Sequence, residues 1–316
     1  MLQLTFVKVS PSGSWDMRGE HMARMLQGSD GIGNASVATC SSLVGRGVLP
    51  SGVYIHVKHP CRPLLGRPGT RHVLDLIDGV ASLAGFDALI ASTQAQIDQR
   101  RLWRYEIHCK LYGAFLRTTD PHNRSLAQAA QNAFCDDHPC VVIPHMGNLP
   151  CTTTAEPPPP RMHGVLGLVG STGDTCSDTR AERKRAFPDA LEQRGANGLC
   201  ELMESIDVAI VWKMSNDQDK PCTRFVMSVL ANRPAIIHSF YACAGEIEGA
   251  APFRCNDTAC ALRTVTAIRN GALNTSFARL RREVTLRNAQ IPAMYRAFCQ
   301  RVSEEAVAHK NESKEI

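Results

Sequence analysis

Short apolar runs rich in β-branched residues recur along the chain and alternate with segments whose apolar positions have helical spacing. In the first half, a helix is predicted at 17–26, where Met22, Met25 and Leu26 share one face. A second, Ala-rich helix is predicted at 125–134. The strands predicted in this half are 3–9, 52–57, 73–77, 88–91 and 140–143. Strands that alternate with helices are typical of a parallel sheet covered on both faces.

The second half repeats this alternation. Its predicted strands are 164–169, 207–212 and 235–238. Its predicted helices are 179–194, 199–204, 223–231, 258–269 and 274–303. Between the halves, Pro157–Pro160 favours an extended spacer, because four prolines cannot lie inside a helix or a central strand.

We therefore predict an α/β chain of two Rossmann-like domains, with parallel sheets that face each other across a cleft. The first domain is expected at 1–150, a Pro-rich linker at 151–163, and the second domain, with closing helices, at 164–316. Open parallel sheets bind ligands beyond the carboxyl ends of their strands, so candidate chemistry is expected there.

Composition and charge exclude several classes. A chain of 316 residues that is 44% hydrophobic can bury a core in each domain and is not intrinsically disordered. The longest apolar runs are far shorter than the roughly 20 residues that cross a bilayer, so no membrane segment is expected. The net charge of +5 is scattered and only 6% of residues are aromatic, which disfavours a nucleic-acid partner and suits an anionic small ligand.

The 13 cysteines are odd in number and form no CxxC pair. No signal peptide is recognised at the N-terminus, so we expect reduced thiols and a cytoplasmic protein. His56, His59 and Cys61 have spacing that suits metal ligands, but Pro60 and Pro63 favour a plain turn. No cluster of three or more histidines is present, and no metal is expected.

Two candidate catalytic groups follow strands of the first half. Asp78 precedes Gly79 at the end of a strand, and His145 follows Pro144 after the last strand. Either side chain suits a general base. A simple Asp-Gly turn explains Asp78 equally well, and His145 can instead cap the interdomain hinge. Asp75, inside its strand, is as compatible with a partly buried structural acid as with a site residue.

The second half offers groups for an anion. Gly170, Ser171 and Thr172 follow a strand in a glycine-rich turn that suits close approach of phosphate oxygens to the backbone. Lys220 and Arg224 lie four residues apart at a predicted helix start, where two cations favour a bound anion such as pyrophosphate. The alternative for Lys220 and Arg224 is a solvated first turn of the helix. Glu246, in the loop after strand 235–238, could accept hydrogen bonds from sugar hydroxyls or merely cap the next helix.

These motifs together resemble the donor half of GT-B-type glycosyltransferases. The residues that carry the resemblance are Asp207–Ile210, Lys220-Pro221-x-x-Arg224, Asn232–Ile237, Gly245-Glu246 and, upstream, Leu166–Gly170. Val141–Asn148 resembles the hinge of that family. Ser12-Gly13 with Arg18-Gly19 resembles its acceptor-side loop, which assigns Gly13 and Arg18 to the acceptor side.

The resemblance implies transfer of a sugar from a nucleotide diphosphate donor to an unknown acceptor, with no cofactor beyond the nucleotide sugar. Lys220 and Arg224 would neutralise the diphosphate, Glu246 would orient the sugar, and Asp78 or His145 would be the base of an inverting reaction. The alternative is a non-catalytic relative that binds a nucleotide or glycan, because Met227 stands where many retaining members have Glu. A solute-binding protein of periplasmic type is a third possibility, disfavoured by the lack of a recognised signal peptide.

Overall fold

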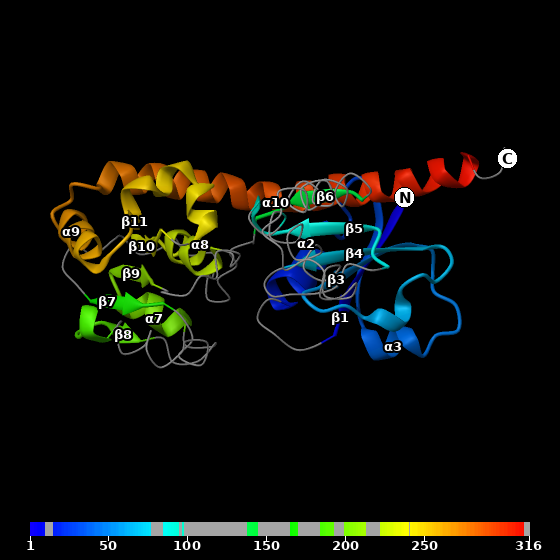
Figure 1. The fold of residues 1–316 in the computed structure, drawn as a ribbon, viewed down its shortest axis with the longest axis horizontal. Helices are drawn as coiled ribbons and strands as arrows, with labels where there is room; N and C mark the ends of the chain where they lie inside the picture. Colours follow the sequence, from blue (N-terminus) through cyan, green and yellow to red (C-terminus); the bar gives the residue numbers. More distant parts are fainter. Residues whose placement is uncertain are drawn as a thin grey trace, which may run out of the picture. The chain divides into compact units, whose positions relative to one another are not determined.

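The structure is a computed structural model. It describes residues 1–9, 15–76, 85–94, 97, 138–144, 165–169, 184–192, 199–212, 222–239 and 241–312. The chain divides into two compact units. Unit 1 contains Met1–Pro144 and Pro292–Ile316, and unit 2 contains His145–Ile291. Each unit is built on one sheet in which every described pair of neighbouring strands is parallel (Figure 1).

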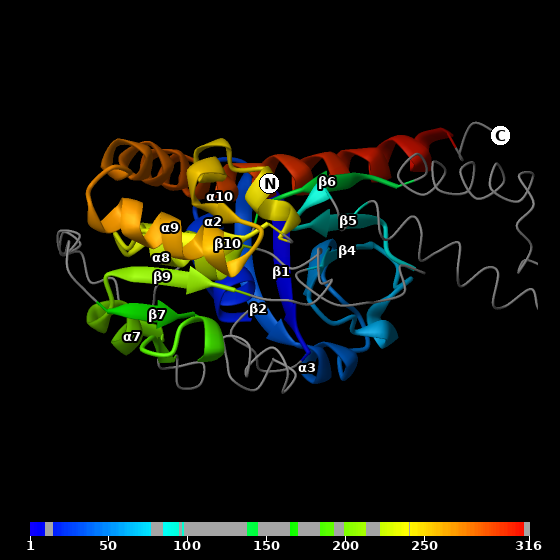
Figure 2. The same cartoon turned by 60° about the vertical axis from the view of Figure 1, so that its left-hand side comes forward.

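Unit 1 has a sheet of six strands in the order β2-β1-β3-β4-β5-β6. The strands are β1 Leu2–Lys8, β2 Ile32–Thr39, β3 Gly52–Val57, β4 Thr70–Leu76, β5 Ala88–Ala91 and β6 Cys140–Val142. The helical segments are a π-helical turn Asp16–Glu20, α2 His21–Leu26, α3 Cys40–Val44 and a 3-10 turn Arg62–Leu64. Strand β5 lies between β4 and β6 (Figure 2). All four of its residues are buried, as expected of a strand inside a parallel sheet.

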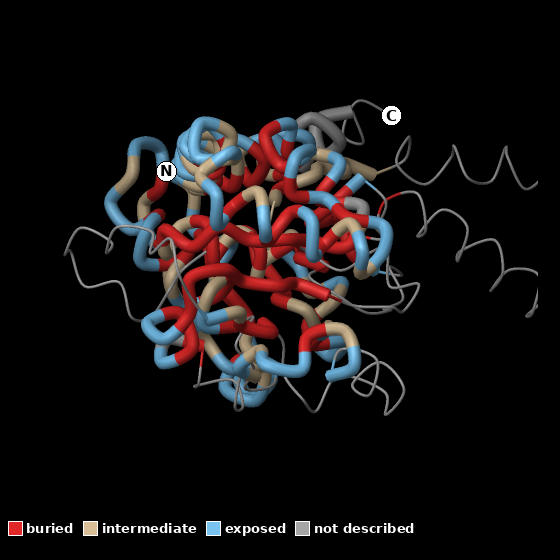
Figure 3. The backbone as a smooth tube through the Cα atoms, turned by 90° about the vertical axis from the view of Figure 1, so that its left-hand side faces the viewer, coloured by how far each residue is buried: buried red, intermediate tan, exposed pale blue. Residues whose placement is uncertain are grey.

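Unit 2 has a sheet of five strands in the order β11-β10-β9-β7-β8. The strands are β7 Leu166–Leu168, β8 Leu191–Glu192, β9 Val208–Val211, β10 Ala235–His238 and β11 Arg254–Cys255. The helices are α7 Leu199–Ser205, α8 Thr223–Leu230, α9 Thr258–Arg269 and α10 Asn274–Glu312, with 3-10 segments at Ala242–Gly245 and Glu248–Phe253. All residues of β9 and β10 are buried. Figure 3 shows buried positions on the inner segments of the tube and exposed positions mostly on the outer ones.

Gly167 in β7 is required by close packing. A Cβ atom at this position would lie 2.6 Å from two side-chain carbons of Ile206, the residue that precedes Asp207 and β9. The absence of a side chain therefore allows β7 to lie next to β9, with Leu166 paired to Val208 and Leu168 to Ile210. Asp207 strengthens this contact, since its carboxylate accepts a hydrogen bond of 3.0 Å from the Val165 N–H.

The two parallel sheets confirm the predicted α/β fold class and are consistent with a GT-B-type chain. Strands β3, β5 and β10 and helix α9 have the predicted bounds. The helix predicted at 179–194 is wrong at its end, because Leu191–Glu192 pair with β7 as strand β8. Strands β2 and β11 and helix α3 were not predicted.

The division of the chain differs from the expected domain bounds at the C-terminus. Helix α10 begins in unit 2, but its continuation from Pro292 onward belongs to unit 1. The reason is burial: Tyr295, Phe298, Cys299 and Val302 are all buried, and the Tyr295 ring packs 6.3 Å from that of Phe6 in β1, centroid to centroid. The predicted linker at 151–163 lies outside the described residues.

Among the residues that the structure describes, four cysteines are paired in two disulfides, Cys40–Cys61 in unit 1 and Cys222–Cys243 in unit 2, each with a sequence separation of 21. The expectation of reduced thiols is therefore wrong for these four residues, and disulfides are typical of oxidising compartments. Within the described part of the chain, no helix combines the length and apolar composition needed to cross a bilayer.

Candidate functional site

Each sheet has a topological switch point, where successive strands begin to be added on the opposite side of the first strand. In unit 2, β7 lies between β8 and β9, so the reversal falls between β7 and β9. In unit 1, β1 lies between β2 and β3, which gives the same topology. Parallel sheets bind ligands beyond the carboxyl ends of the strands at such a reversal. The predicted Gly170, Ser171 and Thr172 follow β7, and Lys220 follows β9, but all four lie outside the described residues.

Two of the predicted donor-side residues lie in the described part of unit 2. Arg224 is the second residue of α8, and Glu246 ends the 3-10 turn Ala242–Gly245 that follows β10. The Cys222–Cys243 disulfide joins the segments that carry them, with the two Cα atoms 5.8 Å apart. The Glu246 N–H donates to the Cys243 carbonyl at 3.2 Å, so the backbone of Glu246 is held next to this cross-link. Both side chains are partly exposed.

The first turn of α8 is electrostatically suited to an anion. The turn contains no acidic residue, and its N-cap, Cys222, makes no side-chain capping hydrogen bond. The helix start carries the positive end of the helix dipole, and Arg224 adds a full positive charge to it. Arg224 thus lies at a helix start, as the sequence predicted, and its role toward a ligand stays a prediction.

Aromatic side chains close the same edge of the sheet. The ring of Trp212, directly after β9, packs edge-on against His238 at the end of β10, with centroids 4.5 Å apart. Phe187 packs against the other side of this cluster, 6.0 Å from Trp212. All three side chains are buried, so they form a rigid apolar base where β9 and β10 end. His238 was not predicted, although a histidine at the end of an apolar strand is visible in the sequence.

The end of α8 explains why Asn stands at position 232. Asn232 has a left-handed backbone, with φ of 59°. Its N–H donates to Val229 O at 3.0 Å, and the Arg233 N–H donates to Ser228 O at 2.9 Å, which together form a Schellman motif. Asn is the residue after Gly that best tolerates this conformation. Asn232 is therefore selected by the left-handed backbone at the end of α8.

In unit 1, Arg18 lies at the centre of a buried polar network. Its Nη1 lies 3.3 Å from a carboxylate oxygen of Asp75, and its Nη2 donates to Ser92 Oγ at 3.0 Å and to the Ile143 carbonyl at 2.8 Å. The Tyr295 hydroxyl accepts from Arg18 Nη1 and donates to Asp75. Arg18 and Asp75 have no exposed side-chain surface. The network thus gives Arg18 a structural role at the carboxyl ends of β4, β5 and β6.

Burial controls the protonation of this network. Removal from water raises the pKa of Asp75 more than the attraction of Arg18 lowers it. Burial likewise raises the pKa of Tyr295 well above its ordinary value, so the phenol stays neutral and donates its proton to Asp75. Asp75 is therefore the structural acid that the sequence left as one of two alternatives.

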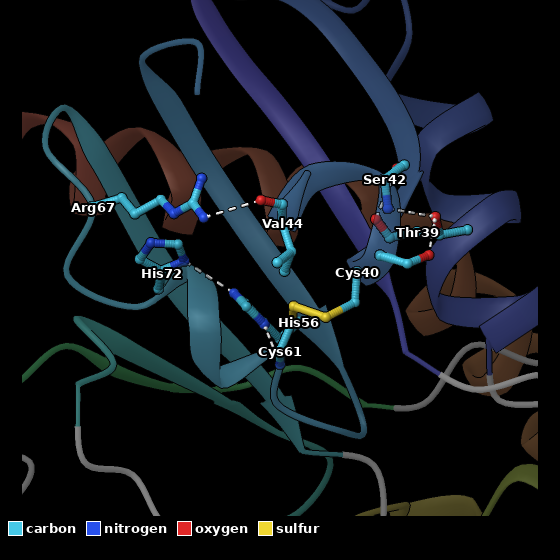
Figure 4. Close-up of a disulfide and its surroundings, with 9 residues drawn as sticks. Thr39, Cys40, Ser42, Val44, His56, Cys61, Arg67 and His72 are labelled. Atoms are coloured by element: carbon cyan, nitrogen blue, oxygen red, sulfur yellow. Dashed lines mark hydrogen bonds between the residues drawn. A yellow bond between two sulfur atoms is a disulfide. The ribbon is translucent and has the colours of Figure 1, made fainter. Parts of the chain in front are cut away.

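The Cys40–Cys61 disulfide joins the residues that follow β2 and β3, on either side of β1 (Figure 4). Beside it, the Cys61 N–H donates to His56 Nδ1 at 3.0 Å, so the His56 proton lies on Nε2. That Nε2 is 3.0 Å from His72 Nδ1, and His72 Nε2 is 2.8 Å from Thr70 Oγ1. His56 and Cys61 are thus committed to other bonds and are not available as metal ligands.

The neutral state of both histidines follows from this chain of bonds. Each ring accepts a hydrogen bond at Nδ1 and donates one at Nε2. A second proton on either ring would sit on Nδ1, where it would face the N–H group that already donates to that nitrogen. Burial lowers the pKa of His56 to about 3, helped by the neighbouring His72. Burial also lowers the pKa of His72 to about 4, although the Asp87 carboxylate acts in the opposite direction.

The remaining predicted residues Gly13, Asp78 and His145 lie outside the described residues. Within the ranges that the structure describes, no group of three or more His, Cys, Asp or Glu side chains is arranged to hold a metal. Sequence reasoning missed Tyr295, because the helix predicted at 274–303 gave no sign of a contact between this residue and Asp75. It also missed the cysteine pairs, for which the equal separations are the only sequence signal.

Comparison with known proteins finds similar solved structures but no matching sequence family. No protein-family model matches the chain, and no curated protein matches it. The chain is similar to a crystal structure described as the glycotransferase of kitacinnamycin, with a TM-score of 0.44 and 12% sequence identity. The likeness covers 94% of this chain and 99% of that one. The function of this chain is therefore inferred from its own residues.

Proposed function

We propose that this protein is a GT-B-type glycosyltransferase that transfers a sugar from a nucleotide diphosphate donor to an acceptor. Unit 2 holds the donor. Arg224 and Lys220 neutralise the diphosphate as it leaves, which is electrostatic stabilisation of developing charge. Gly170, Ser171 and Thr172 give phosphate oxygens access to backbone N–H groups, and Glu246 orients the sugar. Asp78 or His145 acts as the base, and Gly13 lies on the acceptor side.

One observation carries this proposal. A cation at the start of α8 and an acid after β10 lie on segments that follow neighbouring parallel strands, and the Cys222–Cys243 disulfide joins these segments. To bind a diphosphate with an attached sugar, a protein needs a positive charge for the phosphates and a hydrogen-bond acceptor for the sugar hydroxyls. These two groups must lie within one ligand length of each other. The reversal between β7 and β9 supports the same edge of the sheet as the ligand-binding edge.

A second candidate function is a binding protein that recognises a nucleotide or glycan without turnover. Met227 favours it, because this side chain is buried in α8 with 5% of its surface exposed. A carboxylate that would hold the donor ribose is therefore replaced by a residue of the apolar core.

Calorimetric titration with nucleoside diphosphates and their sugar conjugates tests the proposal. We expect the full chain to bind at least one of them, and Arg224→Ala to weaken binding about tenfold or more, which corresponds to roughly 1.4 kcal/mol. Arg263→Ala is the matched control, since Arg263 is an exposed arginine on α9 of the same unit. Failure of the wild-type chain to bind any of these ligands contradicts the transferase and a nucleotide-binding protein.

Measurement of nucleotide release separates the two functions. A transferase releases nucleoside diphosphate from the bound sugar donor, slowly with water and faster with an acceptor. A chain that binds the donor but releases no nucleotide with a panel of sugar, phenol and peptide acceptors is a binding protein. Lys220→Ala and Glu246→Gln then show whether these two side chains act on binding or on release.

A further inference from the structure

Two cysteines at the edge of the second sheet lie unusually close together. Cys255 is the last residue of β11, and Cys260 is in the first turn of α9. Their Sγ atoms are 2.7 Å apart. Atoms that are not bonded to each other are normally about 3.5–4.0 Å apart, whereas a disulfide is about 2.04 Å long. The two sulfurs therefore lie between non-bonded contact and a covalent bond.

The backbone holds the two cysteines in this position. Asp257 caps α9, and its carboxylate accepts a hydrogen bond of 2.7 Å from the Cys260 N–H. The cap turns the helix start back toward the end of β11. On the other side, the Cys255 carbonyl accepts from the Ser239 N–H at 2.9 Å, which fixes β11 beside the end of β10. Little movement is needed to bring the sulfurs into bonding distance.

The surroundings favour sulfur–sulfur chemistry over metal binding. Besides their contact with each other, Cys255 Sγ lies 3.4 Å from the Thr264 hydroxyl, and the Cys260 thiol donates to the Arg254 carbonyl at 3.9 Å. In the described part of the chain, no third His, Cys, Asp or Glu joins these thiols in a metal-binding group, and a structural zinc site needs four ligands.

We propose that Cys255 and Cys260 are a dithiol that is oxidised to a disulfide by exchange with a low-molecular-weight disulfide such as oxidised glutathione. The Cys260 thiolate attacks one sulfur of the oxidant, which forms a mixed disulfide and releases one thiol. The Cys255 thiolate then attacks Cys260 Sγ, which forms the Cys255–Cys260 bond and releases the second thiol. Two electrons and two protons pass from the protein to the oxidant, which is reduced to two thiols.

Burial assigns the order of these steps. Cys255 is fully buried, whereas Cys260 is partly exposed and is the sulfur that an oxidant can reach. Burial and the contact with Cys260 raise the pKa of Cys255 to about 12, so little of it is thiolate at neutral pH. Formation of the bond is therefore expected to be faster at pH 9 than at pH 7. The site needs no assumption about the proposed transferase activity.

Peptide mass analysis tests the proposal directly. Cleavage after Arg254 and Arg263 releases one tryptic peptide, Cys255–Arg263, that contains both cysteines. The native full chain is incubated with oxidised glutathione, unfolded in N-ethylmaleimide and digested without a reductant. We expect this peptide to carry no alkyl group and to be lighter than its dithiol form by two hydrogens. The peptide with the buried Cys299 is the internal control and is expected to carry one alkyl group.

A variant and a stability measurement complete the test. In Cys260→Ser the cross-link cannot form, and Cys255 is expected to remain an alkylatable thiol. Oxidation is expected to raise the melting temperature of the wild-type protein by several degrees and to leave that of Cys260→Ser unchanged. The proposal is overturned if both thiols are alkylated after oxidation, if a glutathione adduct on Cys260 persists, or if the thiols react only after a chelator is added.

Discussion

The guanidinium of Arg18 lies 3.3 Å from the carboxylate of Asp75, and neither side chain is exposed to solvent. Arg18 follows β1 in the chain and Asp75 belongs to β4, so this pair joins two parts of unit 1 that are 57 residues apart. Tyr295 adds a third part, from α10. The network therefore ties the C-terminal segment to the sheet that the N-terminal segment forms.

Arg18→Ala is expected to lower the free energy of unfolding by about 3–5 kcal/mol, because it leaves the Asp75 carboxyl buried without its partner. Urea denaturation measures the change. The matched control is Arg71→Ala, which breaks a half-exposed pair with Asp87 and is expected to cost no more than about 1 kcal/mol. Replacing both partners, as Arg18→Met with Asp75→Leu, is expected to recover much of the loss, and equal losses in the single and double variants contradict this account.

The free energy of unfolding is expected to fall as the pH falls from about 6.5 to about 4. His56 and His72 have pKa values of about 3 and about 4 in the folded chain. The unfolded chain takes up these protons near pH 6.5, so in this window it binds more protons than the folded chain and acid favours it. The loss is about 1.4 kcal/mol per pH unit for each histidine that titrates in this way.

Urea denaturation at several pH values measures this slope. His59→Gln is the control, because His59 is an exposed histidine three residues after His56. Its loss is expected to leave the slope unchanged. His72→Gln is expected to reduce the slope. A free energy of unfolding that does not change between pH 6.5 and pH 4.5 is incompatible with the chain of hydrogen bonds through the two rings.

The Cys222→Ser/Cys243→Ser variant is expected to bind nucleoside diphosphates more weakly, because Arg224 and Glu246 then lose their covalent connection. Calorimetry gives the ratio of dissociation constants. The Cys40→Ser/Cys61→Ser variant is the matched control: it removes a disulfide of the same 21-residue separation from unit 1. Both variants are expected to lose roughly 3 kcal/mol of stability. Equal weakening of ligand binding in the two variants would mean that the effect comes from stability alone.

Asn232→Gly is expected to be more stable than Asn232→Ala by about 1 kcal/mol. Both substitutions remove the amide, so the difference between them isolates the cost of a left-handed backbone, which Gly adopts freely. Thermal or urea denaturation of the two variants gives the value. Asn270 at the end of α9 is the control position, because its φ of −81° gives Gly no such advantage over Ala.

Elements with strong periodicity were predicted well, and weakly apolar ones were not. The four residues of β5 and of β10 are all buried, and apolar runs of this kind marked both strands with their observed bounds. β2 was missed because its sequence, Ile-Gly-Asn-Ala-Ser-Val-Ala-Thr, is mostly small and polar. It lies at the edge of the sheet with mainly partly exposed residues, so pairing with β1 decides its conformation.

The sequence by itself determined the fold class and the segments that carry the proposed ligand-binding residues. Apolar runs and turn residues are local properties, and they suffice to place strands, helix starts and the charged groups Arg224 and Glu246 after them. Only the tertiary structure decided which groups meet. Arg18 is buried with Asp75 and Tyr295, His56 is bonded to His72, and Cys222 reaches Cys243, because strands distant in sequence become neighbours when a sheet forms. Such contacts depend on strand order and helix packing, which no local pattern of residues specifies.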